Sequence, residues 1–341
     1  MTARVIVTGS AGFIGFHLSK LLLELGYSVF GVDALTDYYD PDLKRARLRI
    51  LERHSCYKHH YNRVENYSDL SQIFKQTNPD FVIHLAAQAG VRYSIDAPAE
   101  YVKTNLVGTF NIIDLCQQQN VMHLLMASTS SVYGSNKSMP FDELQKTDTP
   151  MSFYAATKKS NELMAHSYAH IYDLPITMFR FFTVYGPWGR PDMALFKFTK
   201  AIIANEEIEI YNHGKMQRDF TYVTDLVQAI ERLIHVAPPR SHQREAFCQL
   251  SRDSLSDVAP FRVVNIGNSQ PVELMQYIGA IEKALGMAAK KRFLPMQAGD
   301  VQATFADTRL LRDLINVIPS TTIYVGVAEF VDWYKKYYSG K

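Results

Sequence analysis

The fold is decided by the stretch Val5-Ile6-Val7-Thr8-Gly9-Ser10-Ala11-Gly12-Phe13-Ile14-Gly15 near the start of the chain. Its first four residues are apolar or β-branched, which predicts a buried strand. From Phe13 to Leu25, apolar residues recur at the spacing of one helical face. A glycine-rich turn between a strand and a helix lets backbone amides approach the phosphates of a dinucleotide. The stretch therefore predicts a pyrophosphate site at Gly9, Gly12, Phe13, Ile14 and Gly15.

An acidic residue stands where the second strand of such a unit ends. Asp33 follows the predicted strand Ser28–Val32, near the distance from the glycines at which a carboxylate takes the ribose hydroxyls of adenosine. A carboxylate there repels a 2′-phosphate, and no arginine follows directly. The sequence therefore predicts NAD rather than NADP as the cofactor.

Short apolar runs alternate with helical patterns through the first half, which is typical of a doubly wound parallel α/β sheet. We expect residues 1–186 to form a Rossmann-type NAD-binding domain, to which segments near 218–236 and 263–268 return. Residues 187–341 are expected to form mainly a smaller α+β lobe for the substrate. Residues 238–262 are interpreted as an insertion whose role the sequence leaves open. Further strands are predicted at Phe81–Leu85, His123–Ala127, Ile176–Phe182 and 263–267, and a helix at 271–285.

Composition excludes several classes of protein. Thirty-six basic and thirty-four acidic residues leave a formal charge of +2 over 341 residues, which gives no general attraction for nucleic acid or an anionic membrane. Four basic residues within 44–49 are interpreted as a solvated helix face. No apolar run is long enough for a membrane span, and three cysteines lack metal-binding spacing. We expect a soluble cytoplasmic protein without a metal site.

Hydroxyl groups gather at the end of the predicted strand His123–Ala127, where open α/β sheets bind ligands. They belong to Ser128, Thr129, Ser130 and Ser131. Tyr154 opens a predicted helix, and Lys158 lies one turn later on the same face. An ammonium group near a phenol stabilises the phenolate and lowers its pKa. The pattern predicts a catalytic set of Tyr154, Lys158, Thr129, Ser128 and Ser130, in which Tyr154 transfers a proton and Lys158 also holds the cofactor ribose.

With His84-Leu85-Ala86-Ala87, Arg218-Asp219-Phe220 and Gly299-Asp300, these features resemble the extended short-chain dehydrogenases/reductases and their nucleotide-sugar 4-epimerases. Four longer stretches are similar to UDP-glucuronate 4-epimerases: residues 86–94, 154–166, 180–197 and 211–220. The resemblance implies oxidation of a UDP-sugar at C4 by bound NAD, rotation of the 4-keto sugar, and reduction from the other face. It also implies that Leu85, Ala86 and Ala87 contact the cofactor. We expect a homodimer.

A uronic acid makes the 4-keto intermediate a β-keto acid, which loses carbon dioxide readily. The resemblance implies that Thr183 and Arg190 hold the carboxylate, because UDP-galactose 4-epimerases place asparagine at the Thr183 position and arginine suits bidentate binding of a carboxylate. It also implies that Arg218 binds the diphosphate and that Asp300 binds the uridine ribose. Arg92 is a further candidate for substrate contact.

Several alternatives stay open. One is a broader UDP-hexose, UDP-N-acetylhexosamine or UDP-pentose 4-epimerase, or a UDP-glucuronate decarboxylase. Ser130 and Ser131 stand where related dehydratases and decarboxylases carry acidic residues, which disfavours elimination chemistry. Another is an inactive NAD-binding sensor, which the intact catalytic set argues against. Residues 62–65 lack the usual adenine-binding aspartate of the family, so either Glu65 or the backbone alone contacts adenine.

Overall fold

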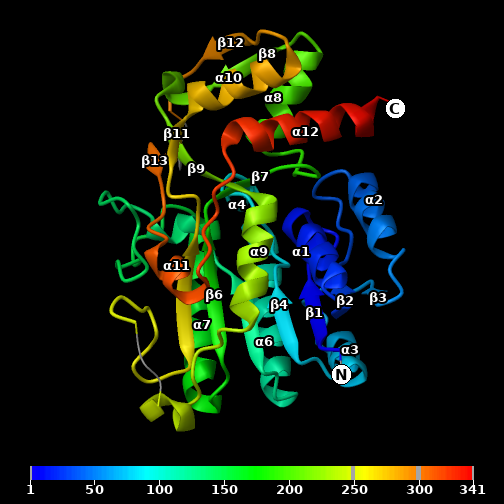
Figure 1. Cartoon of the computed structure of the whole chain (residues 1–341), viewed down its shortest axis with the longest axis vertical. Helices are drawn as coiled ribbons and strands as arrows, with labels where there is room; N and C mark the ends of the chain where they lie inside the picture. Colours follow the sequence, from blue (N-terminus) through cyan, green and yellow to red (C-terminus); the bar gives the residue numbers. More distant parts are fainter. Residues whose placement is uncertain (1, 247–249, 297–300, 340–341) are drawn as a thin grey trace.

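A parallel sheet of seven strands forms the centre of the computed structural model, which describes residues 2–246, 250–296 and 301–339. Its strand order is β10-β6-β5-β4-β1-β2-β3, so the direction of winding reverses between β1 and β4 (Figure 1). The strands are β1 (Arg4–Thr8), β2 (Ser28–Val32), β3 (Tyr57–His60), β4 (Phe81–His84), β5 (His123–Ala127), β6 (Ile176–Phe181) and β10 (Phe261–Ile266). This arrangement confirms the predicted doubly wound fold.

Helices cover both faces of this sheet and enclose two apolar cores. Val5 and Val7 lie in one core and Ile6 in the other, because successive side chains of a strand point to opposite faces. The first core is closed by α1 (Phe13–Glu24), α2 (Pro41–Leu51), α9 (Val223–Ile234) and α11 (Arg309–Ile315). The second core is closed by α3 (Tyr67–Thr77), α6 (Thr109–Gln118) and α7 (Phe153–Tyr172). Between β4 and α6 the chain forms α4 (Tyr93–Asp96), α5 (Pro98–Tyr101) and the π-helical turn η1 (Val102–Gly108).

A smaller α+β lobe lies beyond the carboxyl ends of these strands, at the top of Figure 1. A third apolar core holds together α8 (Ala194–Ile203), α10 (Leu274–Leu285), α12 (Ile323–Tyr338) and β8 (Glu207–Ile210). β12 (Lys290–Phe293) pairs in parallel with β8. A second, four-stranded sheet lies next to it. In that sheet, β9 (Gln217–Tyr222) pairs with β7 (Thr183–Tyr185), β11 (Pro271–Glu273) and β13 (Ala303–Thr304).

The structure differs from the sequence-based expectations in three elements. β10 begins at Phe261, two residues before the predicted strand 263–267 and within the stretch interpreted as an insertion. β3 was not predicted, because its sequence Tyr57-Lys58-His59-His60 is polar, as suits the edge of the sheet. The helix expected at 271–285 begins only at Leu274, since its first three residues pair with β9. The expected boundaries of the two domains stay a prediction. None of the helices in the described ranges combines the length and the apolar character that a membrane span requires.

Candidate active site

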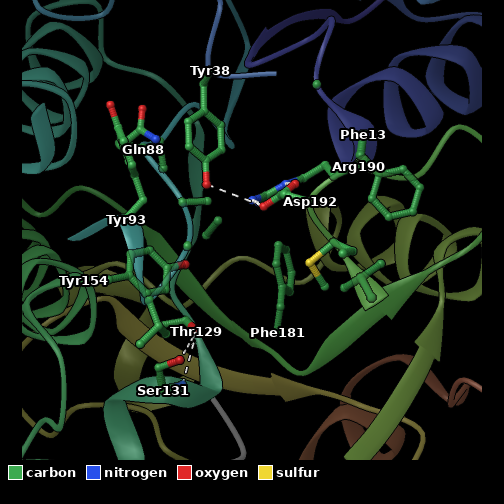
Figure 2. Close-up of a pocket in the computed structure, with 18 of the residues that line it drawn as sticks. Phe13, Tyr38, Gln88, Tyr93, Thr129, Ser131, Tyr154, Phe181, Arg190 and Asp192 are labelled. Atoms are coloured by element: carbon green, nitrogen blue, oxygen red, sulfur yellow. Dashed lines mark hydrogen bonds and ion pairs between the residues drawn. The ribbon is translucent and has the colours of Figure 1, made fainter. Parts of the chain in front are cut away.

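A cavity of about 1420 Å³ opens at the carboxyl ends of β1, β2, β4 and β5 and extends to the smaller lobe (Figure 2). Residues from the glycine turn, the strand ends, α7, β7 and β9 line it together. It gathers all the site residues predicted from the sequence except Asp300, which lies outside the described residues. A single cavity can therefore hold a cofactor and a substrate side by side.

The turn between β1 and α1 has room only for glycine at two points. Gly9 has a φ of +72°, a conformation that other residues rarely adopt. A Cβ atom on Gly15 would lie 2.0 Å from the carbonyl oxygen of Gly9. No side chain caps the N-terminus of α1, which begins directly after Gly12. Its first amides are therefore available to an anion such as a pyrophosphate.

Asp33 is held at the end of β2 by backbone amides. Its Oδ2 accepts from the Ala11 amide at 3.1 Å and its Oδ1 accepts from the Leu35 amide at 2.8 Å. A carboxylate has about four acceptor positions, so ribose hydroxyls can still donate to it. The glycine turn and this fixed carboxylate fit the phosphates and the adenosine ribose of NAD.

Two neighbouring segments complete the cofactor end of the cavity. The amides of Leu85 and Ala86, which follow β4, donate to the Thr8 hydroxyl at 3.2 and 3.1 Å. These bonds place the 85–87 segment directly beside the glycine turn. Glu65 also lines the cavity, where its carboxylate accepts from the Thr104 hydroxyl at 2.6 Å.

The first turn of α7 carries Tyr154. The helix begins after Ser152, whose hydroxyl accepts from the Ala155 amide at 3.1 Å. Lys158 lies one turn later and is 3% exposed. Its ammonium group donates to the carbonyl oxygen of Ala127 at 2.9 Å. Burial lowers the pKa of Lys158 to about 8.

The pKa of Tyr154 differs from the sequence-based expectation. Burial raises it above its ordinary value, while a hydrogen bond with the Thr129 hydroxyl and the charge of Arg190 act in the opposite direction. Lys158, expected to lower this pKa, instead turns its ammonium group to Ala127. The Thr129 hydroxyl donates to the Ser131 hydroxyl at 3.2 Å, and its oxygen accepts from the Ser131 amide at 3.2 Å (Figure 2).

Ser128 belongs to a buried network behind the cavity wall. Its hydroxyl donates to Glu162 at 2.7 Å, and Arg180 donates to both oxygens of that carboxylate at 2.9 Å. The side chains of Glu162 and Arg180 are each 3% exposed. The hydroxyl proton of Ser128, although this residue lines the cavity, is therefore engaged by Glu162. Ser130 lines the cavity itself.

Thr183 and Arg190, which the sequence predicts to contact the sugar, line the same cavity. Thr183 begins β7, and Arg190 follows in the loop before α8. The carboxylate of Asp192 accepts from Nε of Arg190 at 3.0 Å and from Nη2 at 2.5 Å. Burial acts against both charges, but the pairing holds the pKa of Arg190 above its usual value and that of Asp192 below.

The loop that carries Arg190 is tied to the cofactor-binding half of the chain. Arg47, fully buried on α2, donates to the carbonyl oxygens of Trp188 at 2.6 Å and of Ala11 at 2.9 Å. His17 on α1 contacts the carbonyl oxygen of Pro187 at 2.9 Å. The interpretation of residues 44–49 as a solvated face was therefore wrong for Arg47, and also for Lys44, which is 5% exposed.

The two other arginines predicted to contact the substrate, Arg218 and Arg92, also line the cavity. Arg218 on β9 donates to the carbonyl oxygens of Gln217 at 2.8 Å and Gln302 at 3.2 Å. The guanidinium of Arg92 lies 5.3 Å from the ring centre of Tyr211.

The sequence analysis did not identify the structural role of the aspartate that follows Arg218 on β9. Asp219 is fully buried and accepts three backbone amides, from Asn268, Ser269 and Ala306.

Comparison with known proteins gives a consistent result. The profile of the NAD-dependent epimerase/dehydratase family matches residues 5–242. The Staphylococcus aureus protein CapI is 52% identical over 336 residues, covering 98% of this chain and 99% of that protein. A probable UDP-glucuronate 4-epimerase of Rhizobium meliloti is 52% identical over 335 residues, with 98% of each chain covered. A crystal structure of the Bacillus cereus UDP-glucuronic acid 4-epimerase with UDP-glucuronic acid and NAD has a TM-score of 0.86 and 30% identity, covering 98% of this chain and 100% of that one.

Proposed function

The chain belongs to the NAD-dependent epimerase/dehydratase family, and from this premise we propose that it inverts C4 of UDP-glucuronate to give UDP-galacturonate. Membership of the family confirms the predicted relationship to nucleotide-sugar epimerases and the predicted NAD cofactor. The observation that carries the choice of a uronate is one shared cavity. It holds Thr183 and Arg190 together with Tyr154. The names of the Rhizobium meliloti and Bacillus cereus proteins support the same choice.

Tyr154 is the proposed acid–base catalyst. NAD, when bound, supplies a reversible hydride acceptor for C4 of the sugar. Tyr154 takes the proton from the C4 hydroxyl and returns it after the sugar has turned over in the cavity. Thr129 lines the same cavity as Tyr154, and its hydroxyl, which donates to Ser131, is proposed to turn and donate to the same sugar oxygen. Lys158 is proposed to hold the cofactor ribose, and its positive charge then supports the phenolate.

The sugar carboxylate must be held in a fixed orientation while the sugar is in its 4-keto form. Decarboxylation requires the bond between C5 and the carboxylate to align with the π system of the C4 carbonyl. Arg190 and Thr183 are proposed to hold the carboxylate out of that alignment, in a cavity that Ser130 also lines. Arg218 and Arg92 are proposed to bind the nucleotide half. The predicted role of Asp300 stays a prediction.

The experiment is incubation of the purified protein with UDP-glucuronate, followed by separation of the nucleotide sugars by chromatography. The proposal expects a UDP-galacturonate peak that grows to equilibrium. UDP-glucose and UDP-N-acetylglucosamine, tested in parallel, distinguish a broad epimerase from a uronate-specific one. A UDP-pentose as the main product would instead assign a decarboxylase, and no turnover with intact NAD binding would assign a sensor.

We further propose a homodimer formed through α6 and α7, which pack side by side on one face of the large sheet. Apolar side chains on this side are exposed: Val107 by 45%, Phe110 by 42% and Leu163 by 61%. A two-fold axis would bury these residues against their copies. Light scattering tests this: Leu163→Glu should give monomers, whereas Ile203→Glu on α8 should not. A monomeric wild type would contradict the proposal. The expected cytoplasmic location stays a prediction.

A further inference from the structure

Arg190 uses only one of its two hydrogen-bonding edges within the protein. Its Nε and Nη2 atoms engage the carboxylate of Asp192, two residues along the chain. Among the described residues, none accepts a hydrogen bond from its Nη1 atom. The side chains are 20% and 31% exposed, and both line the cavity. The guanidinium is therefore fixed from one side while its other edge is available to a ligand.

Tyr38 fixes the same guanidinium on its face. The ring centre of Tyr38 lies 5.8 Å from the central carbon of Arg190, and its hydroxyl donates to Asp192 at 3.5 Å (Figure 2). Tyr38 comes from the loop after β2 and packs on Tyr93 with 5.0 Å between the ring centres. A ring on the face and a carboxylate on the edge leave the guanidinium little freedom to rotate.

The available edge has the chemistry of a second carboxylate site. A planar guanidinium has five N–H donors, so a carboxylate on the Nε edge still leaves donors on Nη1 and Nη2. A sugar carboxylate can bind there without displacing Asp192. Arg190 and Tyr154 line the same cavity, so a ligand bound at this edge shares the cavity with the proposed acid–base catalyst (Figure 2).

We propose that Asp192 and Tyr38 are positioning residues, which hold Arg190 so that its second edge binds the carboxylate of a UDP-uronate and favours uronates over neutral UDP-sugars. This inference rests on the proposed function. In wild type the held carboxylate stays out of alignment with the C4 carbonyl. When the guanidinium is loose, the bond from C5 to the carboxylate breaks and carbon dioxide leaves. The bonding electrons form the C4 enolate, which takes a proton at C5. The UDP-4-keto-pentose departs, and the two electrons removed from C4 remain with the cofactor.

The test compares Asp192→Ala, Asp192→Asn and Tyr38→Ala with wild type, all saturated with NAD. Asp332→Ala, which removes an exposed aspartate paired with Lys336 on α12, is the control. We expect Asp192→Ala to weaken UDP-glucuronate binding by about tenfold, the scale of one misaligned charge-assisted hydrogen bond. Asp192→Asn should lose less, because its side-chain oxygen still accepts from Nε. Binding of UDP-glucose should change by less than about twofold, since it has no carboxylate to lose.

Mass spectrometry supplies the second readout. Asp192→Ala and Tyr38→Ala should release UDP-4-keto-pentose, whereas wild type and Asp332→Ala should not. Equal losses of uronate and neutral-sugar binding would overturn the inference, because they would indicate damage to the loop. Tighter uronate binding in both Asp192 variants would also overturn it, since Asp192 would then be a competitor. If wild type epimerises UDP-glucuronate and the variants match it in binding and in products, this inference alone is refuted. If wild type does not epimerise UDP-glucuronate, the proposed function is refuted.

Discussion

Replacement of Gly15 by alanine should remove NAD from the protein. The new Cβ would lie 2.0 Å from the carbonyl oxygen of Gly9, whereas ordinary contact begins at 3.4 Å. The two atoms must therefore separate by about 1.4 Å, the difference between these distances. A displacement of that size exceeds the tolerance of a hydrogen bond, so the amides at the start of α1 lose their alignment with the pyrophosphate.

The expected loss follows from the bonds that are misaligned. Two amide-to-phosphate hydrogen bonds at about 1.5–3 kcal/mol each amount to about 3–6 kcal/mol, or roughly a hundred- to ten-thousandfold in NAD affinity. The assay is denaturation of the purified protein and quantification of the released nucleotide per chain. Gly15→Ala should carry little NAD, and added NAD should restore activity only at high concentration.

Gly279→Ala is the matched control, because a Cβ at Gly279 on α10 meets no atom within 4 Å. This variant should keep its NAD and gain about 0.5–1 kcal/mol of stability, as expected for alanine in a helix. Circular dichroism of both variants separates loss of cofactor from loss of fold. If folded Gly15→Ala retained as much NAD as wild type, the steric reasoning and the assignment of this turn to the pyrophosphate would both be refuted.

Three further predictions address the catalyst, the buried arginine and the pH dependence of stability. Tyr154→Phe should lower kcat by about two orders of magnitude or more, while the Kd of UDP-glucuronate measured by calorimetry stays near that of wild type. Arg47→Met should lower the free energy of unfolding in urea by about 2–4 kcal/mol, because two carbonyl oxygens lose their donor, whereas exposed Arg45→Met should change it by under about 0.5 kcal/mol. Burial raises the pKa of Glu143 to about 7, so its contribution to stability is complete below the unfolded value of 4.5 and is lost as pH rises through 7. Between pH 5 and 8 the melting temperature of wild type should therefore fall relative to that of Glu143→Gln, and parallel curves would contradict this.

Local signals in the sequence predicted most of the fold. The strand, the glycine turn and the first helix follow from apolar periodicity and backbone freedom, which depend on neighbouring residues alone. β2 and β5 match their predicted limits for the same reason. β3 escaped prediction because an edge strand needs only one neighbour and tolerates polar side chains. Its register beside β2 is set by the sheet, not by its own composition.

The catalytic and cofactor residues could be proposed from sequence because each follows a strand end or opens a helix. The support of Arg190 could not be proposed in this way. Asp192 lies within the stretch that resembles UDP-glucuronate 4-epimerases, but Tyr38 lies in a different loop, and only the fold brings them together. Arg47 stands in a run of basic residues, a pattern that usually faces water. Arg47 is buried because it donates to the carbonyl oxygens of Trp188 and Ala11. These acceptors lie far away in the sequence, so no local pattern predicts the contact.

These contacts bear on where uronate specificity resides. Arg190 lies in the loop before α8, yet the groups that fix this loop come from α1, α2 and the loop after β2, the segments that surround the NAD site. On the proposed roles, the guanidinium is oriented both by Asp192 of its own loop and by Tyr38 from a loop that lines the cofactor site. A neutral-sugar epimerase given only the 186–193 segment would acquire Arg190 and Asp192, but it would lack Tyr38 and the contacts from α1 and α2 that hold the loop. On these roles, specificity for the uronate depends both on the loop that carries Arg190 and on the loop after β2 that carries Tyr38. A redesign of the sugar-binding residues would therefore have to include residues beside the cofactor site.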